Sequence, residues 1–99
     1  MSFQEIRLGV RRAMERSPHR STVRRIALFG SRLSGQASPT SDVDLLIEFQ
    51  KPVGFFTLIQ VQEDLEQQLG MKVDLVTPKS LSRYIRDEIL RDAKVVYEG

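Results

Sequence analysis

Three short apolar runs alternate with stretches of helical periodicity, and this alternation restricts the fold more than any other feature of the sequence. The runs are bounded by Gly, Pro, Ser or charged residues, as buried strands are, and they occupy residues 24–30, 42–49 and 72–77. Elsewhere apolar side chains recur every three or four residues, which predicts amphipathic helices over residues 3–16, 55–69 and 80–91. A last edge strand is predicted over residues 93–99. The expected fold is mixed α+β, a small mixed β-sheet packed with helices.

Chain length and residue usage exclude several classes of protein. The 99 residues are enough for one domain with a modest core, so a single domain is expected over residues 1–99. The chain has no Cys and one His, His19, which excludes disulfide frameworks, thiol nucleophiles, multi-His metal sites and the usual Ser-His-Asp triad. No apolar run approaches the roughly 18 residues of a membrane span. We therefore expect a cytoplasmic protein with no signal segment.

The net charge of +2 is unevenly distributed. Residues 1–25 carry seven Arg and two Glu, whereas residues 26–99 carry eight basic and eleven acidic side chains. A basic segment of this kind is typical of contacts with nucleic acid or an acidic protein, but it is also typical of a solvated helix face. Because no aromatic residues lie between the arginines, direct nucleic-acid binding is not favoured.

A pair of acidic residues begins the second apolar run. Asp42 and Asp44 are two residues apart on a predicted strand, so both carboxylates point to one face. Such a pair is unfavourable unless a cation lies between the charges, and Mg²⁺ accepts carboxylates together with water and substrate phosphates. Asp74 interrupts the third run, where Asp is rare. If the two strands are neighbours, Asp42, Asp44 and Asp74 could hold two Mg²⁺ ions for phosphoryl or nucleotidyl transfer, with Asp74 as ligand or general base.

Gly30 and Ser31 end the first run and fit the same site. Glycine lets the backbone approach a ligand closely, the Ser31 hydroxyl and nearby N–H groups can hold a phosphate, and Arg32 adds positive charge. Residues 31–41 are predicted to form a loop that begins with one helical turn. Each feature alone is common in structural turns, but together they predict a nucleotide site. A P-loop does not fit, because Gln36-Ala37 stands where Lys and Ser or Thr are required.

These residues resemble the signature of the DNA polymerase β-like nucleotidyltransferase superfamily, which is Gly-Ser, a spacer, Asp-x-Asp and a distant Asp. The chain is most similar to the minimal nucleotidyltransferases of bacteria and archaea, and the resemblance extends over about residues 24–97. It rests on the segments GSR (30–32), SDVDLLIEF (41–49), PVGFF (52–56), EDLEQQLG (63–70) and KVDLVTP (72–78). The family often has Ala-Arg where this chain has Leu33-Ser34. The resemblance implies a polymerase β palm-like fold.

The resemblance also implies a function. Such proteins are antitoxins of HEPN/MNT toxin–antitoxin pairs, and some transfer AMP from ATP, with Mg²⁺, to a tyrosine of a HEPN-family RNase toxin. Two alternatives stay open: an antitoxin that neutralises by steric contact, and a nucleotidyltransferase for a small-molecule alcohol. The short chain favours a protein acceptor, with the partner docking on the basic first helix or on the helix near the carboxyl end. A polymerase is not favoured, because a template-binding domain does not fit in this length.

Overall fold

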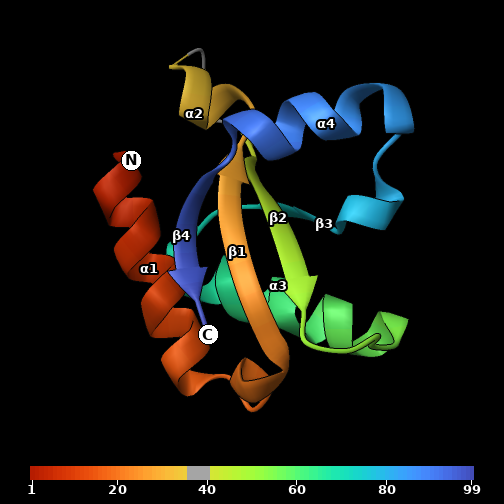
Figure 1. Cartoon of the computed structure of the whole chain (residues 1–99). Helices are drawn as coiled ribbons and strands as arrows, with labels where there is room; N and C mark the ends of the chain where they lie inside the picture. Colours follow the sequence, from red (N-terminus) through yellow and green to blue (C-terminus); the bar gives the residue numbers. More distant parts are fainter. Residues whose placement is uncertain (36–40) are drawn as a thin grey trace.

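The computed structural model describes residues 1–35 and 41–99, and it confirms the predicted mixed α+β fold (Figure 1). Residues 36–40 of the predicted loop lie outside the described residues. No helix in the described part of the chain is long and apolar enough to cross a membrane. The elements follow in the order α1 (Phe3–Arg16), η1 (Arg20–Thr22), β1 (Val23–Phe29), α2 (Ser31–Ser34), β2 (Val43–Phe49), α3 (Phe55–Leu69), β3 (Val73–Val76), η2 (Pro78–Ser80), α4 (Arg83–Asp92) and β4 (Lys94–Glu98).

The four strands form one mixed sheet in the order β3-β2-β1-β4. β1 is antiparallel to both β2 and β4, whereas β2 and β3 are parallel. The register between β1 and β4 shifts between Ile26 and Ala27, which is the signature of a bulge. β3 and β4 are therefore the two edges of the sheet, and the predicted edge strand at the end of the chain is confirmed.

One face of the sheet carries the core. Alternate residues of β2 point to this face, and α1 and α3 cover it with their apolar stripes. The other face is turned toward the viewer in Figure 1, where α4 crosses its upper end. The buried core residues of the two helices and of β2 are Ile6, Val10, Ala13, Met14, Val61, Leu65, Leu69, Val43, Leu45 and Ile47.

Local signals fix the ends of the two long helices. The Ser2 side chain accepts from the Glu5 backbone N–H at 3.2 Å, and the Ser2 N–H donates to Glu5 Oε1 at 3.0 Å, which together form a capping box before α1. α3 ends at Gly70, whose φ of 69° is the left-handed conformation that glycine favours. The predicted helices over 3–16 and 55–69 are confirmed at both ends.

The helix near the carboxyl end differs from its prediction in two ways. It begins at Arg83 rather than residue 80, because Ser82 caps it by accepting from the Tyr84 N–H at 3.3 Å. No residue of α4 is buried, although its periodicity predicted an apolar stripe against the sheet. Tyr84 is 82% exposed and Ile85 46% exposed. The helix lies across the end of the sheet and leaves much of its apolar surface open.

Candidate active site

Two of the three predicted carboxylates face each other across the parallel strands. Asp44 of β2 and Asp74 of β3 are direct register partners, between the flanking pairs Val43–Val73 and Leu45–Leu75. Those flanking pairs point into the core, so the strand alternation turns both aspartates to the opposite face. Asp42 lies just before β2, two residues from Asp44. The second and third strands are therefore neighbours, which is the condition under which the sequence groups Asp74 with Asp42 and Asp44.

The electrostatics of Asp44 reflect this crowding. Its partial burial raises the pKa of the Asp44 carboxyl, and the nearby charges of Asp74 and Asp42 raise it further. A hydrogen bond with the Asp74 side chain acts in the same direction. The charges of all three predicted aspartates therefore act at one place, and those of Asp42 and Asp74 oppose the ionisation of Asp44.

The donor set suits a hard divalent cation. Within residues 1–35 and 41–99, no three His, Asp or Glu side chains are gathered closely enough to hold a metal ion by themselves. Mg²⁺ needs only one or two carboxylates, because water and substrate phosphates complete its shell. Asp44 and Asp74 are such a pair. A cation between them would offset the charge repulsion that contributes to the raised pKa of Asp44. The three-ligand site stays a prediction.

Gly30 makes room for Asp44. It follows β1 directly, with φ 81° and ψ −155°, a backbone region almost restricted to glycine. A Cβ atom at this position would overlap the Asp44 carboxylate and lie 2.9 Å from its Cγ atom. The sequence predicts that Gly30 lets a ligand approach the backbone, and the structure adds that the Asp44 side chain already occupies this space.

The Arg32 side chain forms hydrogen bonds with another part of the chain. Its Nε and Nη2 atoms donate to the Ser41 carbonyl at 3.2 and 2.7 Å, directly before Asp42. Sequence reasoning assigned Arg32 to a phosphate, but these two bonds tie α2 to the start of β2. Ser31 begins α2, and its carbonyl accepts from the Ser34 hydroxyl at 3.2 Å. These bonds hold the Arg32 guanidinium next to Asp42, and its contact with a phosphate stays a prediction.

A cavity of about 530 Å³ adjoins Gly30, between α2 and α4. Apolar side chains form much of its wall, with two acidic residues from α4 at the rim. Sequence reasoning missed the α4 contribution, because nothing local marks a helix that returns to the site after some 50 residues of chain. The lining residues are Phe29, Gly30, Leu33, Ser34, Glu88, Ile89 and Asp92.

This chain belongs to the nucleotidyltransferase family described as "Polymerase beta, Nucleotidyltransferase", whose family model matches residues 14–99. It is 43% identical over 75 residues to "Protein adenylyltransferase MntA" of Thermococcus cleftensis, covering 76% of this chain and 74% of that protein. It is 33% identical over 92 residues to the MJ1217 protein of Methanocaldococcus jannaschii, covering 92% and 94%.

Solved structures agree with this placement. A protein assigned as a minimal nucleotidyltransferase superposes with a TM-score of 0.78 at 29% identity, over 94% of both chains. A toxin–antitoxin complex with AMP-PNP gives a TM-score of 0.74 at 20% identity, over 94% of this chain and 73% of that one, which shows the shared fold. The predicted family resemblance is confirmed, and the chain is a nucleotidyltransferase by family.

Replacing Gly30 by Ala should destabilise the protein through both backbone strain and overlap with Asp44. We expect a loss of about 1–3 kcal/mol in the free energy of unfolding, measured by urea denaturation. In an Asp44→Ala background the overlap is removed, so the loss should shrink. Gly54→Ala is the control, because its Cβ would meet nothing within 4 Å. An equal loss in both backgrounds would contradict the contact between Gly30 and Asp44.

Asp44→Asn should stabilise the metal-free protein at neutral pH. The pKa of Asp44 is higher in the folded state than its usual value of 3.8, so the ionised carboxylate opposes folding above that range. Below pH 3.8 the carboxyl is protonated in both states, and the advantage of Asn should vanish. Urea denaturation in EDTA from pH 3 to 8 measures this. A difference that grows on acidification would refute the crowding of carboxylates.

If Mg²⁺ and ATP bind at the carboxylates as the sequence predicts, Arg32→Ala should raise the Mg²⁺ concentration needed for half-maximal turnover by roughly 10-fold, because the start of β2 and Asp42 lose their anchor. Arg32→Lys should not restore the wild-type value, since an ammonium cannot reproduce the two-donor geometry. A titration with Mg²⁺ at fixed ATP, paired with a titration of ATP at saturating Mg²⁺, distinguishes two roles of Arg32. One is to position Asp42, and the other is to contact a phosphate of ATP. A change confined to the KM for ATP would instead support the phosphate contact predicted from sequence.

Proposed function

We propose that this chain is a Mg²⁺-dependent protein adenylyltransferase and antitoxin, which transfers AMP from ATP to a tyrosine hydroxyl of a HEPN-family toxin. The observation that carries the proposal is the Asp44–Asp74 pair, brought into register by the parallel strands beside Gly30. Paired carboxylates on one sheet face are the arrangement that nucleotidyl transfer requires. Gly30 and Ser31 would lie along the triphosphate, with Asp42, Asp44 and Asp74 as the metal ligands.

The proposed reaction is a displacement at the α-phosphorus of ATP. The tyrosine oxygen forms a bond to this phosphorus, the bond to the bridging oxygen of the β-phosphate breaks, and pyrophosphate leaves. The Asp74 carboxylate is exposed and accepts the hydroxyl proton as general base. When bound, Mg²⁺ supplies charge neutralisation of the phosphates and orients them. The cavity wall formed by Phe29, Leu33 and Ile89 suits a flat base such as adenine.

The comparisons support a protein as the acceptor. The relative in Thermococcus cleftensis is named a protein adenylyltransferase, and a structural neighbour is a Shewanella oneidensis complex described as a tri-AMPylated HEPN toxin with an MNT antitoxin. That neighbour has a TM-score of 0.63 at 18% identity and shows a shared fold, so the support for a protein acceptor comes from the named relative. On this chain, the open apolar surface of α4 beside the cavity is where a partner would present its tyrosine.

Incubation of the chain with a HEPN-family partner, Mg²⁺ and ATP labelled at the α-phosphate tests the proposal. We expect the label on one or more partner tyrosines and a loss of partner RNase activity. Asp42→Asn combined with Asp44→Asn should abolish labelling, because the variant would no longer hold the Mg²⁺ that neutralises the phosphate charge. Glu63→Gln is the matched control, an exposed acidic residue on α3.

Two outcomes would favour the alternatives. Neutralisation that survives the double aspartate change would support steric antitoxin action without catalysis. Label on a free small alcohol in the absence of any partner would support a small-molecule transferase. Either result overturns the proposed reaction.

A further inference from the structure

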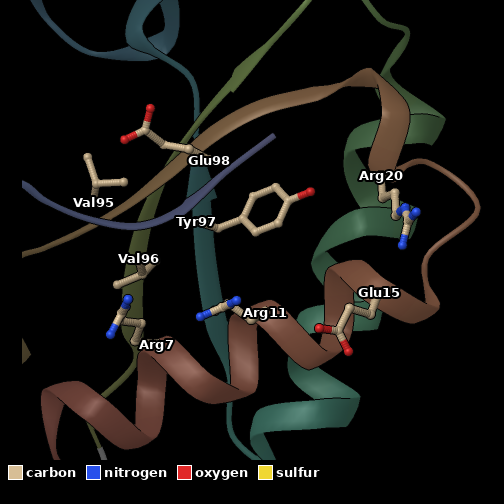
Figure 2. A pocket seen from close by; sticks show the side chains of 8 residues that line it. All are labelled: Arg7, Arg11, Glu15, Arg20, Val95, Val96, Tyr97 and Glu98. Atoms are coloured by element: carbon tan, nitrogen blue, oxygen red, sulfur yellow. The ribbon is translucent and has the colours of Figure 1, made fainter.

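A basic hollow of about 480 Å³ lies between α1 and β4, on the sheet edge opposite to β3 (Figure 2). It is thus separated from the carboxylates of β2 and β3 by the width of the sheet. Three of its eight lining residues are arginines, and four are consecutive residues of the edge strand. We call this site the basic hollow, and its lining is Arg7, Arg11, Glu15, Arg20, Val95, Val96, Tyr97 and Glu98.

The arginines of the basic hollow are not engaged in ion pairs with the described chain. Ion pairs among the described residues are Arg25–Glu48 and Arg91–Asp92. Arg7 donates to the neutral Gln4 side chain at 3.3 Å, which leaves its charge uncompensated. Such unpaired guanidinium groups suit an anionic ligand.

The side-chain directions in Figure 2 concentrate positive charge in the basic hollow. Arg7 and Arg11 stand one helical turn apart and reach toward β4, while Arg20 approaches from the other end. The Tyr97 hydroxyl points toward Arg20, and the Glu98 carboxylate is turned away from the arginines. The lining therefore holds three guanidinium groups, one hydroxyl and two acidic side chains, of which Glu15 lies among the arginines and Glu98 faces away from them.

The strand side of the basic hollow favours a polypeptide. β4 pairs with β1 only, so its outer edge has no strand partner within the described chain. An extended segment can bond to the backbone groups of such an edge while its side chains meet the neighbouring helix. The bulge in the pairing of β4 with β1 limits the added segment to a few residues.

We propose that the basic hollow binds a short, extended acidic segment of the protein on which the catalytic site acts. The proposal rests on the proposed function for the existence of that protein. RNA is a poorer match, because Glu15 interrupts the row of arginines and Tyr97 is the one aromatic residue in the lining, whereas RNA-binding grooves use several aromatic platforms. Contacts here would hold the partner without touching the reacting groups, so they lower KM rather than raise kcat.

The test compares two double variants of α1 with the same spacing and charge change. Arg7→Glu with Arg11→Glu reverses the basic hollow, whereas Arg12→Glu with Arg16→Glu reverses exposed arginines that do not line it. Calorimetric titration of each full chain with the purified HEPN-family partner, without ATP, gives the affinity. We expect the first variant to bind at least about 10-fold more weakly than the second, as truncation of central charged anchors does. In labelling assays its KM for the partner should rise while kcat is kept.

Equal weakening in both variants would show a net-charge effect only and overturn the proposal, as would unchanged affinity in the first. Binding of a 12-nucleotide single-stranded RNA by the wild-type chain, lost only in the first variant, would overturn it in favour of RNA. Thermal melting of both variants checks folding, and Arg7→Gln with Arg11→Gln repeats the test without charge reversal. Tight partner binding without label transfer would refute the proposed catalysis but leave this docking site intact.

Discussion

The parallel pairing of β2 with β3 is the constraint on which the rest of the site depends. Val43 and Leu45 enter the core opposite Val73 and Leu75, and this apolar register forces Asp44 and Asp74 to face each other on the other side. A slip of β3 by one residue would turn Asp74 into the core and expose Val73 and Leu75, so the core specifies the position of this charge. The site is thus held by residues that never touch a substrate.

That arrangement lowers the stability of the protein when no ligand is bound. The raised pKa of Asp44 shows that burial and neighbouring charge oppose its ionisation, and Gly30 adopts a backbone conformation almost restricted to glycine to leave space for it. Arg32 acts beside them by holding the carbonyl of Ser41, which fixes the approach of the chain to Asp42. Backbone strain and charge repulsion that occur together at one place in a fold are typical of functional sites, where binding of a ligand offsets them.

Sequence reasoning predicted the elements well where the signals are local. The recurrence of apolar residues every three or four positions predicted both long helices, and the alternation in 42–49 marks which face Asp44 takes. The hydrogen bonds from Arg32 to Ser41 could not be predicted, because they join residues nine positions apart that no local sequence pattern relates. The exposure of α4 could not be predicted either, since periodicity shows which side of a helix is apolar but not what covers it.

Basic and acidic residues that are separated along the sequence also lie apart in the structure. Three arginines of the first 25 residues, Arg7, Arg11 and Arg20, line the basic hollow beside the outer edge of β4, whereas Asp44 and Asp74 lie toward the opposite edge of the sheet. Without a cation, an acidic molecule is repelled at the carboxylates and attracted at the basic hollow. A partner that is acidic near its docking segment would therefore be oriented before contact, with its other parts directed toward the catalytic end. Under the proposed function, such orientation would raise the rate of productive encounters with the protein acceptor.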